Sequence, residues 1–299
     1  MSSDIQNHRN NAGVTVIVPS YNHKKYLLEC LDSIKNQTLQ DFQWIVVDDG
    51  SSDGSQELLK DMQLHYGYEL ILQKNKGVSA TLTDVIKNYA QGEYIACCAS
   101  DDSWMPDKLS LQVSFMDSHP ECGMCYGRAQ RMDVNSRILG VFDDSNYRGG
   151  KVFDDIITQR FHPPVNYMYR KSVLDELGYF PTGVIAEDFY MNCLIASKYE
   201  IGYIDVILAK YREVIIGKKR DPFCLYKSHE ETILKYHDTP VFDRAISLQR
   251  LRYFMGLSRY KKYKLLSIKY AFKSVKYFYK KDYILALARL LLKWEDCVS

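Results

Sequence analysis

The sequence predicts an α/β protein, with a mostly parallel sheet flanked by helices and a helical C-terminal extension. Three observations lead to this fold class. Short β-branched apolar runs alternate with segments of helical periodicity over residues 14–99, which is typical of a parallel sheet with right-handed crossovers. Each run ends in a turn rich in Asp, Ser, Asn or Gly. From about residue 226 onward the pattern is helical.

The first strand is predicted at residues 14–20, VTVIVPS, because this β-branched run reaches a proline at its end. A helix is expected over 26–34, where apolar residues recur on one side. The scheme repeats with a strand at 44–47 and a helix at 55–62, for which Ser55 is the expected N-cap.

Two further passes complete the parallel part of the predicted sheet. They are a strand at 69–73 with a helix at 79–89, and then a strand at 93–99. Ligands of such sheets bind beyond the carboxyl ends of the strands, so three strand ends are expected to form one crevice. These ends are residues 19–22, 48–53 and 100–102.

Beyond residue 102 the pattern changes from alternating strands and helices to a mixed α+β arrangement. The predicted elements are a helix at 105–120, strands near 123–128 and 165–170, a short helix at 171–180, a helix at 186–199 and a strand at 203–212.

The composition favours a globular protein of the cytoplasm. Hydrophobic residues make up 46% of the 299 residues and charged residues 25%, which supplies a core and excludes wholesale disorder. No apolar run reaches the roughly 18 residues of a spanning helix. The polar residues 1–12 lack the apolar stretch of a secretory signal, so the eight cysteines are expected as reduced thiols. Cys122 and Cys125 have the spacing of a zinc pair, but no second pair accompanies them.

The formal net charge of +2 conceals an asymmetry along the chain. Residues 226–299 contain 16 Lys and Arg against 7 Asp and Glu, a balance of +9, which leaves −7 for residues 1–225. An acidic body with a basic end is unlike a nucleic-acid binder, in which positive charge covers a whole face. The pattern indicates one surface that attracts anions.

Paired carboxylates follow two of the predicted strands. Asp101 and Asp102 are adjacent, so on an extended chain one side chain can face a sugar hydroxyl and the other a metal. The expected metal is Mg²⁺ or Mn²⁺, because these ions prefer oxygen ligands and bridge carboxylates and phosphates. Taken alone, these two residues could also begin a helix as cap and first-turn charge, and Asp48 and Asp49 could simply form a turn.

Four segments together resemble a family-2 inverting glycosyltransferase with the GT-A fold, of the bacterial polysaccharide-biosynthesis type. They are VTVIVPSYNHKKYLLECLDSIKNQTLQDFQWIVVDDGSSDGS, NKGVS, GEYIACCASDDSWMPDKL and RKSVLDELGYFPTGVIAEDFYMNCLIA, in the expected order over roughly residues 13–215. The resemblance implies transfer of a sugar from a nucleotide-diphosphate donor, with UDP-sugars favoured, to an acceptor hydroxyl. It also implies a GT-A catalytic domain at 13–225, which the composition sets apart from a polar tail at 1–12 and a basic, Tyr-rich helical region at 226–299.

The resemblance assigns roles to individual residues. Asp188 is expected to be the catalytic base, with Glu187 beside it to orient the acceptor. Asp102 is expected to bind the divalent ion, Mn²⁺ or Mg²⁺, with Asp101 on the ribose or assisting the metal. The residues expected to surround the donor nucleotide are Pro19, Tyr21, Asp48, Asp49, Lys76 and also Asp101.

These residue types suit an inverting transfer, which is a single in-line displacement. Such a reaction needs a base at the acceptor and neutralisation of the charge that grows on the departing diphosphate. It needs no nucleophilic Ser or Cys.

Three features of the sequence differ from the family pattern. Ala99 stands where members often have another acidic residue, and Leu82-Thr83 stands where many have Arg-Asn. No His follows the strand predicted at 203–212, although members often place one there. A basic run could neutralise the diphosphate instead, and it consists of Lys218, Lys219 and Arg220. His162 could line the acceptor pocket.

The basic end has the pattern of a membrane-surface helix. Residues 251–294 contain 12 Lys and Arg, one acidic residue and seven Tyr. At 100° per residue an apolar stripe and a lysine stripe lie about a quarter turn apart. They are Leu265, Ile268, Phe272, Val275 and Tyr279, and Lys269, Lys273, Lys276 and Lys280. Packing on the catalytic body and self-association into a homo-oligomer are the alternatives.

The sequence therefore predicts a metal-dependent glycosyltransferase on the cytoplasmic face of a membrane, acting on a lipid-linked or growing surface polysaccharide. The alternative is a noncatalytic nucleotide-sugar-binding subunit of an assembly complex. A dehydrogenase or a nucleotidyltransferase is disfavoured, because no glycine-rich loop follows the first strand, where the sequence reads PSYNHKK.

Overall fold

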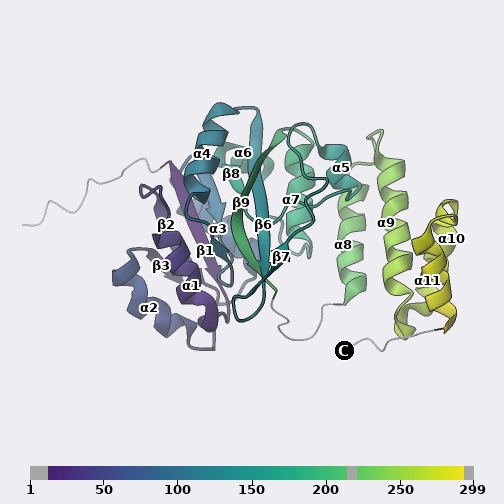
Figure 1. Cartoon of the computed structure of the whole chain (residues 1–299), viewed down its shortest axis with the longest axis horizontal. Helices are drawn as coiled ribbons and strands as arrows, with labels where there is room; N and C mark the ends of the chain where they lie inside the picture. The colour runs from purple at the N-terminus through teal and green to yellow at the C-terminus, as the bar shows by residue number, and fades with distance from the viewer. Residues whose placement is uncertain (1–12, 214–220, 293–299) are drawn as a thin grey trace, which may run out of the picture. The chain divides into compact units, whose positions relative to one another are not determined.

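The computed structural model describes residues 13–213 and 221–292, which form two compact units (Figure 1). Unit 1 contains the described residues up to Lys151, with Pro163–Thr182 and Lys198–Glu213. Unit 2 contains Val152–His162, Gly183–Ser197 and the described residues from 221 onward. The domain boundaries expected at 12/13 and 225/226 stay predictions, and the tail at 1–12 lies outside the described residues.

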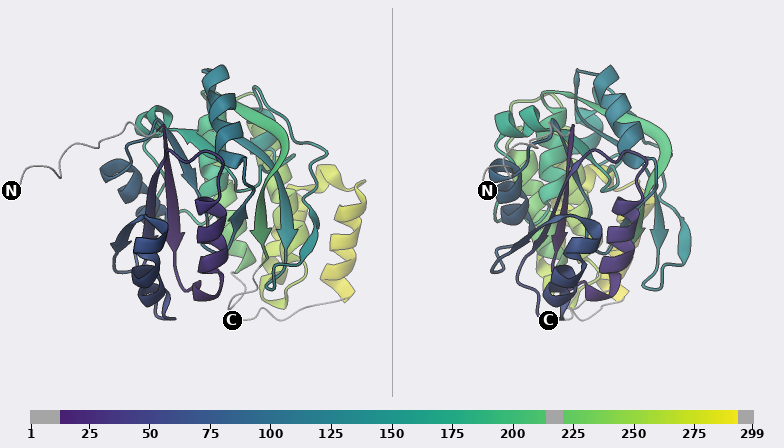
Figure 2. Two further views of the ribbon diagram at one scale, coloured as in Figure 1. Left: turned by 60° about the vertical axis from the view of Figure 1, so that its left-hand side comes forward. Right: turned by 90° about the vertical axis from the view of Figure 1, so that its left-hand side faces the viewer.

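Within the described residues, nine strands of unit 1 form one sheet in the order β3-β2-β1-β4-β8-β6-β9-β5, with β7 paired to β6. The strands are β1 Val14–Ser20, β2 Gln43–Asp48, β3 Glu69–Leu72, β4 Tyr94–Cys97, β5 Ser103–Trp104, β6 Cys122–Met132, β7 Ile138–Val141, β8 Met168–Arg170 and β9 Glu200–Arg212. The same strands can be followed from two further directions in Figure 2.

The first half of the sheet is parallel, as the alternation of strands and helices predicted. β1 pairs in parallel with β2 and with β4, and β2 pairs in parallel with β3. The second half is mixed, because β8 is antiparallel to both β4 and β6, whereas β9 is parallel to β6. The predicted α/β fold with a mostly parallel sheet is confirmed.

Helices of unit 1 cover this sheet. They are α1 Lys24–Lys35, α2 Ser55–Tyr66, α3 Val78–Asn88, α4 Lys108–Ser118 and α6 Lys171–Leu177. α1 forms because apolar residues recur at intervals of three and four, so that Leu27, Leu31 and Ile34 are all buried. They pack against alternate residues of β1 in one core cluster. Burial of this face holds α1 against β1.

Some local predictions need correction. Ser55 is not the N-cap of α2: the helix begins at Ser55 itself, and Gly54 is the N-cap with φ of 88°. Asp53 instead accepts hydrogen bonds from the backbone nitrogen (3.0 Å) and the hydroxyl of Ser55. The two-residue strand β5 and the strand β7 were not predicted, because each is too short or too exposed to show a clear period.

Unit 2 is helical. Its helices are α5 Phe153–Ile157, α7 Glu187–Ala196, α8 Pro222–Leu234, α9 Phe242–Leu257, α10 Lys264–Lys273 and α11 Lys281–Leu292. α9 packs between α8 on one side and α10 and α11 on the other (Figure 1). The core of this packing includes Phe254 and Leu257 of α9 with Ala286 of α11. α8 begins at Pro222, and the side chain of Asp221 caps it by accepting from Phe223 N.

The basic end is not the single helix that its two stripes assumed. α10 stops at Lys273, and a short turn separates it from α11, which begins at Lys281. Tyr270 and Ala271 face the core, whereas Leu265 and Phe272 of the apolar stripe are exposed. None of the helices in the described part of the chain has the length and apolar composition needed to cross a bilayer.

Candidate functional site

The turn after β2 is organised by Asp48, whose side chain is fully buried. Its Oδ2 accepts from Ser20 Oγ (3.2 Å) and Ser51 Oγ (2.6 Å). Its Oδ1 accepts from Ser51 N (2.8 Å) and from Gln56 Nε2 (2.9 Å). These four bonds use about all the accepting positions of a carboxylate. Asp48 therefore joins the ends of β1 and β2 and shapes the loop between them and α2.

Asp49 joins the same loop to the segment after β3. Its carboxylate accepts from Gln73 Nε2 (2.8 Å), Lys76 N (3.0 Å) and Gly77 N (2.9 Å). The Lys76 side chain is exposed, and its Nζ lies 2.7 Å from Asp84 Oδ2. Asp49 thus fixes the backbone of the NKG segment.

Tyr21 lies at the end of β1, between Ser20 and the left-handed residue Asn22. Asn22 N donates to Ser51 Oγ (2.8 Å), which ties this segment to the loop after β2. Pro19 is half-buried, whereas Tyr21 exposes 49% of its surface. An exposed aromatic ring beside two hydrogen-bonded turns is a suitable surface on which a nucleobase can stack.

Asp101 and Asp102 follow β4 and have different surroundings, as adjacent residues of an extended chain should. Asp101 is half-buried, and its Oδ1 lies 3.7 Å from Nδ1 of His23. Asp102 is 5% exposed, and its Oδ1 accepts from Arg212 N (2.8 Å). Burial, and then the charge of Asp101, raise the pKa of Asp102 well above its usual range, while Arg212 opposes this.

Arg212, at the end of β9, holds this segment in place. Its guanidinium donates to the carbonyl oxygens of Asp101 (2.7 Å) and Asp133 (3.0 Å) and forms an ion pair with Glu29. The Arg212 side chain is only 1% exposed. In the sequence Arg212 is only the last residue of the strand predicted at 203–212, and no local pattern distinguishes it.

The arrangement at Asp101 and Asp102 fits a hard divalent ion. A buried carboxylate next to a second one is costly in its charged form, and a cation would remove that cost. Within the described residues no group of three or more His, Cys, Asp or Glu is arranged to hold a metal. Ala99 is exposed and supplies no ligand. The remaining ligands would have to be phosphate oxygens and water, which Mg²⁺ commonly keeps.

In unit 2, Glu187 and Asp188 begin α7. Asp188 Oδ2 lies 3.3 Å from His162 Nε2, and both side chains are partly exposed, at 38% and 41%. Asp188 Oδ1 accepts from Phe189 N (2.7 Å). Glu187 is half-buried. His162 thus lies beside the residue expected to be the base, and its place in an acceptor pocket stays a prediction.

His229 of α8 lies behind this pair and was not singled out in the sequence. Its ring packs against Phe189 at 4.6 Å between centroids. Burial, with the charges of His162 and Arg252, lowers the pKa of His229 to about 4, although Asp188 opposes the shift. At neutral pH His229 is therefore an uncharged residue under α7.

The candidate residues are divided between the two units. Those expected to hold the donor and the metal belong to unit 1, and Glu187 and Asp188 belong to unit 2. Their convergence on one substrate stays a prediction. The basic run Lys218, Lys219 and Arg220 lies outside the described residues.

The cysteine pair and the two residues at the Arg-Asn position are parts of the packed structure. Cys122 and Cys125 are buried in β6. Leu82 is buried, and Thr83 Oγ1 donates to Phe180 O (3.0 Å), so neither offers a charge in place of Arg-Asn.

Comparison with known proteins gives one family match: the model described as "Glycosyl transferase family 2" matches residues 15–178. An uncharacterized glycosyltransferase of Methanocaldococcus jannaschii is 28% identical over 67% of this chain and 70% of its own length. An uncharacterized glycosyltransferase of Rickettsia felis is 33% identical over 67% of this chain, but only 33% of its own length. A putative teichuronic acid biosynthesis glycosyltransferase, TuaG of Bacillus subtilis, is 36% identical over 34% of this chain and 41% of its own length. The match therefore spans less than two thirds of the length of the R. felis and B. subtilis proteins, and 70% of the length of the M. jannaschii protein.

Solved structures share the fold at low sequence identity. TarS 1–349 of S. aureus in complex with UDP-GlcNAc gives a TM-score of 0.66 at 21% identity, covering 91% of this chain and 81% of TarS. The mannosyltransferase PcManGT of Pyrobaculum calidifontis, in complex with GDP-Man and Mn²⁺, gives 0.58 at 19% identity, covering 94% of this chain and 87% of that one.

Proposed function

From the premise that this chain belongs to glycosyl transferase family 2 and is a glycosyltransferase, we propose that it moves a sugar from a UDP-sugar to an acceptor hydroxyl with inversion. The observation that supports this most directly is the set of hydrogen-bonded turns built by Asp48, Asp49 and Asp102 at the carboxyl ends of β2 and β4. The similar structure of TarS contains UDP-GlcNAc, which favours UDP as the nucleotide.

The proposed donor site uses residues of unit 1. In this proposal Tyr21 offers its exposed ring to the base, and Asp101, half-buried beside His23, accepts from the ribose hydroxyls. Asp102 would hold Mn²⁺ or Mg²⁺ together with the diphosphate. When bound, such an ion neutralises the negative charge that grows on the departing diphosphate. The PcManGT structure, which contains Mn²⁺ with GDP-Man, makes this cofactor reasonable for the fold.

The proposed chemical step uses Asp188 as general base. Its carboxylate takes the proton of the acceptor hydroxyl while that oxygen forms a bond to the anomeric carbon. The bond from this carbon to the diphosphate breaks on the opposite side, and its electron pair leaves with the diphosphate. In the proposed step His162, 3.3 Å from Oδ2, orients the carboxylate, and Glu187, at the start of α7, orients the acceptor.

The acceptor is proposed to be a lipid-linked or growing surface polysaccharide at the cytoplasmic face of a membrane. The TuaG match supports a surface polymer, although it covers only 34% of this chain. The exposed side chains of Leu265, Phe272 and Val275, beside the exposed Lys269 and Lys273, are suited to an anionic membrane surface.

The test of the proposed function is the substitution Asp188→Asn. Removing the base should lower the transfer rate by roughly 10²-fold or more, because general base catalysis contributes at least that much. UDP affinity should stay within about twofold, because Asp188 is not one of the residues proposed to bind the donor. Transfer is measured with UDP-sugars and Mn²⁺, and UDP affinity by calorimetry. Asp175→Asn, at an exposed surface ion pair, is the matched control.

Unchanged transfer by the Asp188 variant would remove this residue as the base. A noncatalytic binding subunit is the rival function, and the exposed Ala99 and buried Leu82 favour it because they reduce the polar groups of the site. That rival predicts UDP-dependent stabilisation of the unmodified protein without turnover on any donor.

A further inference from the structure

Unit 2 contains a pocket of about 330 Å³ where α8, the end of α9 and α11 meet. The residues that line it include Tyr226, Arg252, Gly256, Arg259, Asp282 and Arg289. None of them belongs to the residues proposed to bind the donor or to act as base. The pocket is therefore a structural feature that the proposed transfer reaction does not use.

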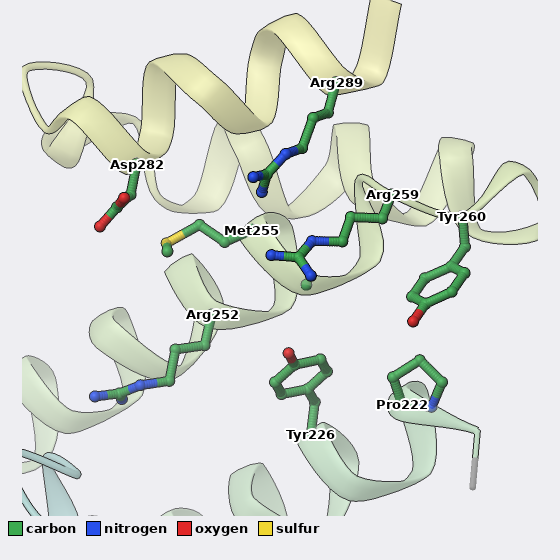
Figure 3. A pocket seen from close by; sticks show the side chains of 9 residues that line it. Pro222, Tyr226, Arg252, Met255, Arg259, Tyr260, Asp282 and Arg289 are labelled. Atoms are coloured by element: carbon green, nitrogen blue, oxygen red, sulfur yellow. The ribbon is translucent and has the colours of Figure 1, made fainter. Parts of the chain in front are cut away.

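Two guanidinium groups dominate this pocket. Arg259, just after α9, and Arg289 of α11 extend toward the same space, and the hydroxyl of Tyr226 points to it from α8 (Figure 3). Among the described residues neither arginine forms an ion pair. Asp282 also lines the pocket, but it is exposed and lies apart from the two guanidinium groups (Figure 3). The two charges are thus available to an anion.

Arg252 adds a third positive charge to the wall. Its Nη2 donates to the carbonyl oxygens of Thr158 (2.7 Å) and Gln159 (3.2 Å), and its guanidinium points away from the other two (Figure 3). Its Nη1 is buried and has no hydrogen-bond partner in the described part of the chain. Arg252 therefore adds positive charge near the pocket, while its donors point elsewhere.

The position of Tyr226 depends on a glycine in α9. A Cβ added at Gly256 would lie 2.1 Å from Tyr226 Oη and 2.5 Å from Cζ, so only glycine allows the tyrosine ring this close to the helix. Burial raises the pKa of Tyr226, with the charges of Arg259 and Arg252 opposing the shift, so its hydroxyl keeps its proton and can donate. The pocket therefore offers two guanidinium forks and one hydroxyl donor.

We propose that this pocket binds a phosphoryl group, as a phosphate monoester or diester. Guanidinium groups bind phosphate oxygens through paired N–H donors, and two of them with a hydroxyl match a tetrahedral anion better than a planar carboxylate. The volume leaves room for a small group esterified to the phosphate. Two sources present this chemistry, a soluble phosphate ester and the headgroup of an anionic lipid.

The test is calorimetric titration of the full chain with inorganic phosphate and with glycerol 3-phosphate, at constant ionic strength. We expect saturable binding, weakened roughly tenfold or more by Arg259→Gln with Arg289→Gln, because each change removes a charge-assisted hydrogen bond. Arg244→Gln is the matched control, since this arginine of α9 is exposed and does not line the pocket. Gly256→Ala should also weaken binding, because it displaces Tyr226.

Vesicles containing phosphatidylglycerol separate the two sources. Vesicle binding that glycerol 3-phosphate competes away identifies a lipid headgroup, and binding of the soluble ester alone identifies a free phosphate ester. No saturable binding of either probe, or equal binding by the double variant, would overturn the proposal.

UDP titration of the same variant separates this site from the donor site: unchanged UDP affinity is expected, and its loss would assign the arginines to the donor diphosphate instead. Where the double variant does not fold, the single variant Arg259→Gln, at an exposed residue, replaces it.

Discussion

Asp102 is buried and His229 is partly buried, and the loss of water around each side chain moves the two pKa values in opposite directions. It raises that of Asp102 well above the usual range and lowers that of His229 to about 4. The cause is the same in both, because burial disfavours the charged form of an acid and of a base alike. One residue is thereby prepared for a cation, and the other is kept neutral under α7.

The metal role of Asp102 is tested by Asp102→Ala. We expect Mn²⁺-dependent UDP binding to weaken by roughly tenfold or more, since a carboxylate ligand is lost, while UDP binding in EDTA is unchanged. Calorimetry with and without Mn²⁺ measures both. Asp107→Ala, at an exposed carboxylate near the start of α4, is the control. Full turnover of the unmodified enzyme in excess EDTA would exclude a metal role.

His229 makes a prediction about acid stability. Its folded pKa of about 4 lies below the usual 6.5, so the unfolded state binds more protons between these values. Stability should therefore fall as pH drops from about 6.5 toward 4, by on the order of 2–3 kcal/mol from this residue. Urea unfolding at pH 7 and pH 4.5 should show a smaller loss for His229→Gln than for the unmodified protein. Parallel losses in both proteins would contradict the assignment.

Among the elements, β9 connects the metal-site turn to the rest of unit 1 through its last residue. The Arg212 side chain donates to the carbonyl oxygens of Asp101 and Asp133 and pairs with Glu29, and the Arg212 backbone nitrogen donates to Asp102 Oδ1. The partners of the side chain lie in the segments just after β4 and β6 and in α1, so one side chain joins three parts of unit 1 near the predicted ligands. Replacing it leaves Glu29 without its partner and buried carbonyls without a donor.

Arg212→Gln should therefore destabilise the protein by about 1–3 kcal/mol, the usual cost of leaving buried acceptors without a donor, since Arg212 is buried while Glu29 is 38% exposed. Urea unfolding followed by circular dichroism measures the loss. Arg131→Gln is the control, because Arg131 pairs with Glu213 at the surface and a much smaller effect is expected there. Equal losses in both variants would show that Arg212 does not stabilise this junction.

At the level of elements, periodicity predicted the helices and strands well where they bury one face. β1 and the helix over Lys24–Lys35 agree closely with the strand and helix expected at 14–20 and 26–34. The basic end was less predictable, because periodicity alone cannot show that the chain breaks after Lys273. The break turns the apolar stripe outward while Tyr270 and Ala271 fill the core.

For the molecule as a whole, this outward stripe gives a prediction about location. Changing Lys269, Lys273, Lys276 and Lys280 to Glu should abolish flotation with anionic liposomes, since each lysine near such a surface contributes about 1 kcal/mol. Binding of the unmodified protein should fall with salt. A control with the same charge change uses exposed lysines of unit 1, which are Lys35, Lys60, Lys87 and Lys151. Failure of the unmodified protein to float would refute membrane contact.

The sequence by itself determined the α/β class, the order of the first four strands and the residues at their carboxyl ends, because these depend on local periodicity and turn chemistry. Only the tertiary structure decided that Asp102 would meet Arg212, 110 residues away, and that His162 would meet Asp188. The same holds for the pocket formed by Tyr226, Arg259 and Arg289. Such contacts join residues that no local pattern relates, and packing of whole elements brings them together.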